Sequence, residues 1–199
     1  MHPSETADRY DQLARWWQGK VPPQYGLAGL ERALRFARKE GASLDVGCGS
    51  EGRFMKVLRT HGFEPEGLDI SSAMIELARE RDAEAVFYTA DISTWEVPRS
   101  YAFISAWDST FHLPMELQEP VLRKLCGALE AKGVILFTCG GGEPSEIKGS
   151  FQGQDFGYST LGVEAFVRIL HECGCFCRHV EYDQHPEEHV IIVGEKKPE

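Results

Sequence analysis

The chain has 199 residues, of which 42% are apolar and 26% charged, so it is long enough for one globular domain with a buried core. Its formal net charge is −10, and no cluster of lysine and arginine offsets it, which disfavours a nucleic-acid substrate. No apolar run approaches the roughly 18 residues of a membrane helix, and the N-terminus is too polar for a signal peptide, so we expect a cytoplasmic protein with no membrane partner.

Two helices are predicted at the start of the chain. Ser4 can cap a first helix that runs to about Trp17, and the turn-forming stretch KVPPQYG at 20–26 ends it. A second helix is predicted over 27–39, with Gly41 as its stop signal.

From residue 42 onward, strands and helices alternate. The predicted strands are 42–46, 63–68, 85–88, 101–106 and 133–138, and the predicted helices are 53–60, 71–81, 114–130 and 160–172. The strand at 133–138 is largely apolar, as expected in the middle of a parallel sheet. This order predicts an α/β fold in which a doubly wound sheet carries helices on both faces.

The last two strands depart from that order. They are predicted at 175–182 and 189–195, and only the short stretch DQHPEE separates them. A parallel connection needs a dozen or more residues, so these two strands must pair antiparallel.

The stretch LDVGCGSEGRF (44–54) leads from a strand into a glycine-rich turn and then into a helix. Such a turn cradles a nucleotide, and Gly47, Gly49 and Gly52 satisfy the G-x-G-x-x-G pattern. Asp69, in GLDIS, follows at the distance at which an acidic residue binds a ribose. The same geometry serves NAD, FAD and S-adenosylmethionine, so the pattern alone does not choose among them.

The charges near this turn favour S-adenosylmethionine over a dinucleotide. Asp45 and Glu51 flank the turn, where a pyrophosphate needs N–H groups without neighbouring carboxylates. S-adenosylmethionine has no phosphate and carries an ammonium and a sulfonium, which carboxylates attract. Asp91, in TADIS, adds a carboxylate at the same sheet edge, where it or nearby backbone can accept a hydrogen bond from an adenine amino group.

LDVGCGSEGRF, GLDIS, TADIS and the final antiparallel pair together resemble the class I S-adenosylmethionine-dependent methyltransferases, in their small type 11 group, over about residues 40–195. This resemblance implies a Rossmann-like three-layer sandwich whose seven-stranded sheet has the order 3-2-1-4-5-7-6, with strand 7 antiparallel. It also implies S-adenosylmethionine as the cofactor and S-adenosylhomocysteine as its product. The chain departs from the family at Ser50 and Glu51, which leaves the role of Gly52 open.

The resemblance implies a set of contacts for the methionyl and ribose parts of the cofactor. Gly47, Cys48 and Gly49 would pass close to the methionyl group. Asp45 would hold the turn or the ammonium, and Asp69 would bind both ribose hydroxyls. A simple helix cap is the alternative for Asp69.

A second set of implied contacts surrounds the adenine. Ile70 and Met74 would form its walls, and Asp91 and Ile92 would address its edge. Trp107, at the end of the fourth strand, completes the set of cofactor residues. The alternatives are a turn-closing role for Asp91 and a core position for Met74.

The methyl acceptor should lie beyond the fourth strand, in SAWDSTFHLP (105–114). Amino-group methyltransferases of the family carry an Asn/Asp-Pro-Pro-aromatic motif there, which is absent. His112 is a candidate general base, because its ordinary pKa is near neutrality, and packing before the next helix is the alternative. Asp108 is a candidate for orienting the acceptor, and closing the turn is its alternative.

Two segments can cover the acceptor. The stretch 139–159 is much longer than a usual connection and is rich in aromatic and amide side chains, which favours a lid; a disordered excursion is the alternative. At the N-terminus, Tyr10, Trp16, Trp17 and Tyr25 can fold over the cofactor. The alternative is that the two tryptophans belong to an apolar helix face that docks on the sheet.

Neither the cysteines nor the histidines predict a metal site. CGCFC (173–177) is interpreted as small buried residues, because Gly174 is a natural helix C-cap that separates the thiols. HPEEH (185–189) cannot form the helix that a histidine pair four residues apart needs, because Pro186 interrupts it.

The sequence therefore predicts an S-adenosylmethionine-dependent methyltransferase with a small-molecule acceptor that is methylated at O, N, S or C. Residues 1–39 form N-terminal helices that can act as a lid, and 40–199 form the cofactor-binding domain. One alternative is a non-catalytic protein that binds S-adenosylmethionine or S-adenosylhomocysteine. A single-domain nicotinamide oxidoreductase is another, although no Tyr-x-x-x-Lys spacing occurs in the chain.

Overall fold

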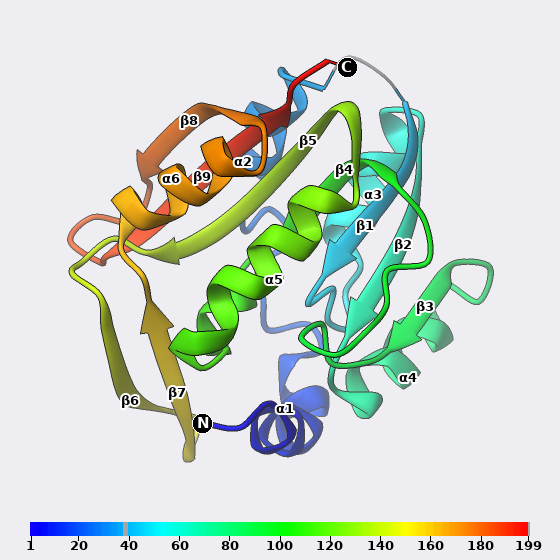
Figure 1. The fold of residues 1–199 in the computed structure, drawn as a ribbon. Coiled ribbons are helices and arrows are strands. Elements are labelled where there is room, and N and C mark those ends of the chain that lie inside the picture. Colours follow the sequence, from blue (N-terminus) through cyan, green and yellow to red (C-terminus); the bar gives the residue numbers. More distant parts are fainter. Residues whose placement is uncertain (38–39, 199) are drawn as a thin grey trace.

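The computed structural model describes residues 1–37 and 40–198, and at its centre is a seven-stranded sheet with the order β3-β2-β1-β4-β5-β9-β8 (Figure 1). The strands are β1 (Gly41–Val46), β2 (Phe63–Asp69), β3 (Val86–Thr89), β4 (Tyr101–Ala106), β5 (Leu129–Gly140), β6 (Ser145–Phe151), β7 (Gln154–Thr160), β8 (Cys175–Tyr182) and β9 (His189–Lys196). The helices are α1 (Pro3–Trp17), α2 (Leu27–Leu34), α3 (Arg53–Thr60), α4 (Ser72–Arg81), α5 (Met115–Gly127), α6 (Val163–Glu172) and the 3-10 turn η1 (Thr110–His112).

The order of the sheet is the one that the family resemblance implied. Strands β6 and β7 lie outside it, so the expected strands 6 and 7 correspond to β8 and β9. The first five strands run parallel, and β9 pairs antiparallel with both β5 and β8. The antiparallel pairing predicted from the short 183–188 connection is therefore confirmed.

Strands β1 and β4 lie in the middle of the sheet, and both of their faces are buried. Every residue of β4 is buried, and in β1 only Gly41 is partly exposed. The parallel register pairs Val46 with Leu68 of β2 and Leu44 with Ile104 of β4. The carboxyl ends of three adjacent strands therefore reach one edge of the sheet.

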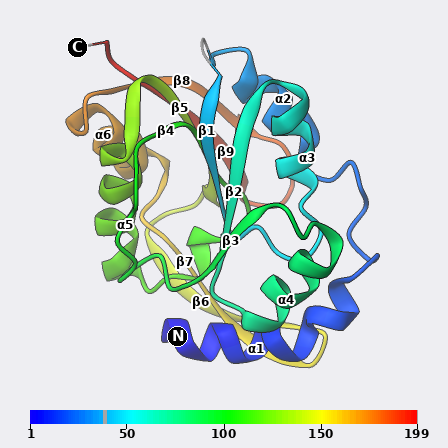
Figure 2. The ribbon, with the colours of Figure 1, turned by 90° about the vertical axis from the view of Figure 1, so that its right-hand side faces the viewer.

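Helices cover the two faces of the sheet in separate apolar cores (Figure 2). On one face, α5 and α6 pack through residues such as Leu125 and Ile169 against Ile135 and Ile192. On the other face, α2 and α3 pack through residues such as Leu30 and Leu58 against the opposite side chains of β4, β5 and β9. The three layers are those predicted from the alternation of elements.

The 139–159 stretch is a β-hairpin rather than a loop or a disordered excursion. β6 and β7 pair antiparallel as a separate two-stranded sheet, with Phe151 opposite Gln154. Gln152 and Gly153 form the turn with φ of 51° and 76°, the left-handed conformation that a two-residue hairpin turn favours. The sequence analysis did not predict this hairpin, for which the Gln-Gly pair at 152–153 was a usable signal.

Several predicted boundaries differ from the observed ones. His2, not Ser4, is the N-cap of α1, because its ring accepts a hydrogen bond from the Ser4 N–H while Glu5 accepts one from the His2 N–H. α2 ends at Leu34, where tight turns with bonds to the third preceding residue take over; Lys39, the predicted end, lies outside the described residues. Thr160 ends β7 instead of starting a helix.

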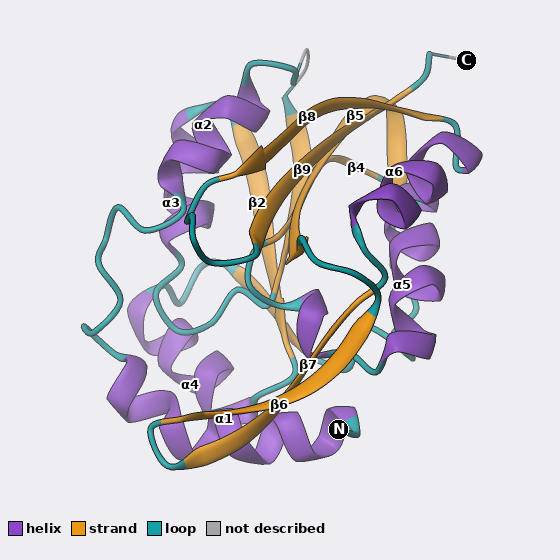
Figure 3. Cartoon of the chain, turned by 90° about the vertical axis from the view of Figure 1, so that its left-hand side faces the viewer, coloured by secondary structure: helices purple, strands orange, loops and turns teal. Residues whose placement is uncertain are grey.

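Helix α1 lies across the carboxyl ends of the strands, alongside the β6–β7 hairpin and α4 (Figures 2 and 3). Asp11 holds it there: one carboxylate oxygen accepts the Ser71 hydroxyl at 2.6 Å and the Ala73 N–H at 3.0 Å, at the start of α4. A carboxylate at a helix N-terminus is favourable because the unpaired N–H groups and the helix dipole are both positive there. None of the helices in the described ranges is long and apolar enough to cross a bilayer.

Candidate functional site

A pocket of about 290 Å³ lies at the carboxyl ends of β1, β2 and β4, between them and the pair formed by α1 and the hairpin. This edge is where open α/β sheets bind their ligands. Every residue predicted from the sequence for cofactor binding or catalysis lines this pocket, with the exception of Asp45. The fold therefore brings together side chains that lie far apart along the chain.

Gly47 and Gly49 shape the turn after β1. Both have positive φ, 74° and 58°, which glycine adopts without the steric penalty of a Cβ. The N–H groups of Gly47 and Cys48 donate to the Leu68 carbonyl at 2.7 and 3.1 Å, which fixes the turn against β2. A Cβ at Gly47 would collide with the Ser109 side chain, whereas a Cβ at Gly49 would meet no atom within 4 Å. The wall at Gly49 is therefore open to a ligand.

Asp69 ends β2 and has a fixed orientation at the pocket wall. One carboxylate oxygen accepts the Gly49 N–H and the other accepts the Ser71 N–H, both at 2.9 Å. Burial raises the pKa of Asp69, and these two N–H groups oppose the shift. The cap of α4 is Ser71, whose hydroxyl accepts the Met74 N–H, so the alternative role of Asp69 as the helix cap is wrong.

The pocket side near β3 carries Ile70, Met74, Asp91 and Ile92. One oxygen of Asp91 accepts the Ser93 N–H at 2.8 Å, so the turn-closing role that the sequence left open is present. The loop after β3 is also held from α5. The Lys124 ammonium donates there to three carbonyl oxygens at 2.8–2.9 Å, those of Ile92, Ser93 and Trp95.

Asp45 lies below the pocket rather than in its wall. Its carboxylate accepts the Ser105 hydroxyl at 2.7 Å, across the β1–β4 pair. Burial raises its pKa to about 6, and the Ser105 hydrogen bond opposes the rise. These contacts tie the turn after β1 to the neighbouring strand.

His112 lies at the end of η1, buried among aromatic rings, and both ring nitrogens have partners. Nδ1 is 3.0 Å from the Gly157 carbonyl, which only accepts, so Nδ1 carries the proton. Nε2 is 2.8 Å from the Tyr10 hydroxyl and accepts from it. Burial lowers the pKa of His112, which keeps the ring neutral, so Nε2 carries no proton and accepts the hydrogen bond from Tyr10.

Asp108 follows β4 in a conformation that is uncommon outside glycine, with φ of 49°. Its carboxylate accepts the Tyr25 hydroxyl at 2.8 Å and the His189 Nε2–H at 2.8 Å. Trp107 packs beside it against Gly26 and Gly29, where a Cβ would press on the indole ring. The loop after β4 is thus tied to the segment between α1 and α2.

Aromatic contacts join α1 to the hairpin over the pocket. Phe151 stacks on Trp17 and meets Trp16 edge to face, with ring centroids 5.4 and 5.2 Å apart. The ring centroids of Tyr10 and Phe156 are 5.0 Å apart. The two segments that the sequence offered as separate lids therefore form one cover.

Sequence reasoning missed Arg53, Ser109, Asp183 and His189. Arg53 lines the pocket at the start of α3, directly after the glycine turn, and its Nε donates to the Tyr25 carbonyl at 2.9 Å. Its position next to Gly52 was a usable signal. Asp183 follows β8 and His189 is the first residue of β9, and the pairing of β9 with β5 brings them beside Asp108, which lines the pocket.

The cysteines are all free thiols, and within residues 1–37 and 40–198 no group of three or more ligand side chains is arranged to hold a metal ion. Cys175 is fully buried and Cys177 is partly buried. Cys48 lines the pocket, and burial raises the pKa of its thiol, which keeps it protonated.

The chain matches known proteins in sequence and in fold. It is 31% identical over 152 residues to a malonyl-[acyl-carrier protein] O-methyltransferase of Salmonella typhimurium, an alignment that covers 75% of this chain and 59% of that protein. It is 27% identical over 136 residues to a dTDP-3-amino-3,6-dideoxy-alpha-D-glucopyranose N,N-dimethyltransferase of Streptomyces fradiae, covering 66% of this chain and 52% of that one. The chain thus spans little more than half the length of these two relatives.

In fold, the chain is similar to DhpI in a complex with S-adenosylhomocysteine. The TM-score is 0.76 at 20% sequence identity, and the match covers 99% of this chain and 98% of that one. A family model described as a methyltransferase domain matches residues 17–148, which is more than half of the chain. On this match and on the sheet order and glycine turn described above, the chain belongs to the methyltransferase domain family, with the fold of the class I S-adenosylmethionine-dependent enzymes.

Proposed function

We propose that the protein is an S-adenosylmethionine-dependent methyltransferase that acts on a small-molecule acceptor. The observation that carries this proposal is one pocket in which the open glycine turn, the Asp69 carboxylate and the neutral His112 ring are combined. The first two suit an adenosine ligand without phosphates, and the third suits the removal of a proton from an acceptor.

The residues at the pocket wall fit this cofactor. Gly49 leaves space at the wall, and Asp69 is held with lone pairs free for two hydroxyl groups. Ile70 and Met74 offer apolar contacts to an adenine, and the second oxygen of Asp91 can accept from its amino group. Asp45 would act indirectly, through the turn that it supports.

Arg53 is the natural partner for the cofactor's carboxylate. Among the described residues that line the pocket it is the single lysine or arginine. Its guanidinium carbon lies 5.6 Å from the centre of the Tyr25 ring, and its Nε donates to the Tyr25 carbonyl. The remaining N–H groups of the guanidinium are suited to a carboxylate.

The bound cofactor supplies a methyl group on a positively charged sulfur. The protein then has to hold the acceptor in line, exclude water and take up a proton. Nε2 of His112 is the proton acceptor, and the Tyr10 hydroxyl, from another residue that lines the pocket, is hydrogen-bonded to it. A proton from an acceptor O–H or N–H can therefore pass to His112 either through the Tyr10 hydroxyl or directly, once that hydroxyl has moved aside.

The cover favours a small acceptor. Residues 1–39, of which 1–37 are described, and the β6–β7 hairpin would close over it as a lid on the 40–199 domain. The aromatic side chains of this cover suit an acceptor with an apolar or ring-shaped body. The two relatives described above, one an O-methyltransferase and one an N,N-dimethyltransferase, support oxygen and nitrogen as acceptor atoms.

Calorimetry and a turnover assay test the proposal together. We expect S-adenosylhomocysteine to bind with micromolar affinity and NADH not to bind. We also expect labelled methyl groups to move from S-adenosylmethionine to some members of a panel of small amines, alcohols and phenols. Binding of NADH alone would contradict the cofactor assignment, and tight S-adenosylhomocysteine binding with no transfer to any class of acceptor would favour a non-catalytic binder.

A further inference from the structure

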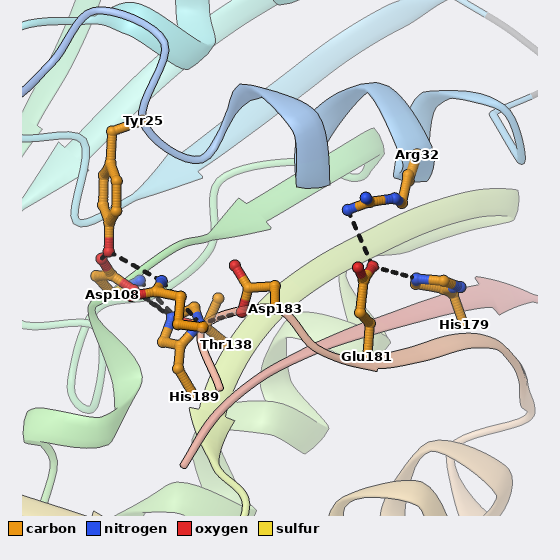
Figure 4. A network of polar contacts seen from close by, with 9 residues as sticks. Tyr25, Arg32, Asp108, Thr138, His179, Glu181, Asp183 and His189 are labelled. Atoms are coloured by element: carbon orange, nitrogen blue, oxygen red, sulfur yellow. Dashed lines mark hydrogen bonds and ion pairs between the residues drawn. The ribbon is translucent and has the colours of Figure 1, made fainter. Parts of the chain in front are cut away.

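His189 lies between two carboxylates at the edge of the pocket (Figure 4). Its Nε2 is 2.8 Å from an oxygen of Asp108, and its Nδ1 is 2.5 Å from an oxygen of Asp183. The imidazole is mostly buried, and its centroid is 5.4 Å from that of the Trp107 ring. A histidine that donates from both nitrogens to carboxylates is fixed in position and carries a proton on each nitrogen.

Asp108 is held on several sides by this arrangement. One oxygen receives His189 and, at 3.3 Å, the Thr138 hydroxyl, while the other receives the Tyr25 hydroxyl at 2.8 Å. The Asp108 N–H in turn donates to Thr138 at 2.9 Å. These bonds accompany the positive φ of Asp108, a backbone conformation that persists only where its surroundings determine it.

Tyr25 connects this arrangement to the cover of the pocket. Val21 and Tyr25, from the segment between α1 and α2, both line the pocket. The Tyr25 ring is anchored at its hydroxyl by Asp108 and, at 3.3 Å, by Gln184, and its backbone carbonyl is anchored by Arg53. The orientation of the Asp108 carboxylate is thus one of the contacts that set the position of the segment over the pocket.

We propose that His189 is a positioning residue of the methyltransfer site: bridged to Asp183, it holds the Asp108 carboxylate against the Tyr25 hydroxyl and so keeps the 18–26 segment closed over the bound cofactor. The inference rests on the proposed function, because it assigns a role in that same pocket. His189 and Asp183 lie outside residues 17–148, which the family model matches, so the device belongs to this chain's own C-terminal strands.

The protonation of His189 makes the closure sensitive to pH. Burial alone lowers the pKa of His189, but the hydrogen bonds and charges of Asp108 and Asp183 outweigh it and raise the pKa above its ordinary value. Two other titratable side chains adjoin this cluster: Tyr25, which donates to Asp108, and Arg53, which donates to the Tyr25 carbonyl. The Glu188 carboxylate, next to His189 in the chain, lies near Gly141. Below its raised pKa, His189 carries a proton on both ring nitrogens and donates to both Asp108 and Asp183. As pH rises through that pKa, His189 loses one of these protons and with it one of the two hydrogen bonds.

Calorimetric titration of S-adenosylhomocysteine across about pH 5.5 to 8.5 tests this inference in the full chain. For the unaltered protein we expect the affinity to fall roughly fivefold to tenfold as His189 loses its proton. His189→Gln retains an N–H donor toward Asp108 at every pH. Its affinity for S-adenosylhomocysteine should therefore depend little on pH and stay close to that of the unaltered protein at low pH. His189→Ala should bind roughly five- to tenfold more weakly than the unaltered protein on the acidic side, again without that pH dependence.

His179 provides the matched control. It lies in β8, 2.9 Å from Glu181, which pairs with Arg32, and neither partner lines the pocket (Figure 4). His179→Gln should leave the pH profile of binding unchanged.

An unaltered profile in both His189 variants, or the same change in His179→Gln, would overturn the inference and leave the proposed function intact. Absence of S-adenosylhomocysteine binding by the unaltered protein would overturn the proposed function itself. If His189→Ala does not fold, the loss of pH dependence in His189→Gln decides.

Discussion

Burial acts in opposite directions on the two titrating side chains at the centre of the site. It raises the pKa of Asp69, whose two backbone N–H bonds favour the ionised form. It lowers the pKa of His112, whose ring nitrogens lie beside the Gly157 carbonyl and the Tyr10 hydroxyl. A carboxylate held by N–H groups and a neutral imidazole are thus maintained in one pocket. The first is suited to binding hydroxyl groups and the second to accepting a proton.

Replacing Asp69 should remove the main polar contact to the cofactor. Asp69→Ala should abolish detectable S-adenosylhomocysteine binding in calorimetry, and Asp69→Asn should weaken it by roughly tenfold or more, because one acceptor oxygen remains. The alanine variant also leaves the Gly49 and Ser71 N–H groups without their partner, so a lower melting temperature is expected. Near-normal affinity in Asp69→Ala would remove this residue from the site.

His112 and Tyr10 should affect turnover more than cofactor binding. His112→Gln should lower kcat roughly 100-fold, and Tyr10→Phe roughly tenfold, with S-adenosylhomocysteine affinity changed little. In the unaltered protein kcat should fall as pH drops through the lowered pKa of His112, because a protonated Nε2 cannot accept a proton. The measurement that tests this role is the pH dependence of kcat, whose fall at low pH should be absent in His112→Gln. An unchanged rate and pH profile in this variant would leave His112 with a packing role only.

At the scale of secondary-structure elements, the cover depends on contacts between segments about 130 residues apart. The helix α1 contributes Trp16 and Trp17 and the hairpin contributes Phe151, and Asp11 anchors the helix to α4. Neither segment is a part of the seven-stranded sheet, so the cover is held to the domain through side-chain contacts.

Weakening the contact between α1 and the hairpin should impair closure and leave the domain folded. Phe151→Ala removes the ring that meets both tryptophans, and we expect kcat/KM to fall between roughly ten- and a hundredfold. Limited proteolysis should also cut the 18–26 segment faster. Ile147→Ala is the matched control, because Ile147 lies on the same hairpin and is 62% exposed. Equal effects of the two substitutions would contradict the role of the cover.

At the scale of the whole molecule, Asp45 lowers the stability of the domain at neutral pH. Its carboxyl is buried under the pocket with the Ser105 hydroxyl as its partner, and its pKa is raised from 3.8 to about 6. In this interval the folded protein keeps a proton that the unfolded chain has lost. The free energy of unfolding therefore falls as pH rises from about 4 to 6.

Asp45→Asn should remove this dependence. The amide has no charge to bury and its oxygen can still accept from Ser105, so the variant should be more stable than the unaltered protein at pH 7, by roughly 2–3 kcal/mol. Below about pH 4 the two should be equally stable, because the carboxyl is then protonated in both the folded and the unfolded state. Urea unfolding of both proteins at these two pH values is the measurement, and a difference that does not grow with pH would contradict the role of burial.

The order of the strands in the sheet was implied by the family resemblance. The residues themselves predicted the layered sheet, its antiparallel final pair and the contents of the glycine turn. These depend on local patterns: apolar runs in β1, β4 and β5, the fixed spacing from Gly47 to Asp69, and a connection between β8 and β9 too short for a parallel crossover. The β6–β7 hairpin was missed because its residues are mostly polar and its turn depends on two left-handed residues.

Only the tertiary structure decided which side chains meet at the pocket. The pairing of Tyr10 with His112 joins residues 102 positions apart, and that of His189 with Asp108 joins residues 81 positions apart. No periodic pattern in the sequence predicts these two contacts. They follow from how the strand ends are arranged and from where α1 and the β8–β9 pair pack. The protonation states follow from the same packing, since burial and the partner atoms, rather than residue type, set the pKa values of His112 and His189.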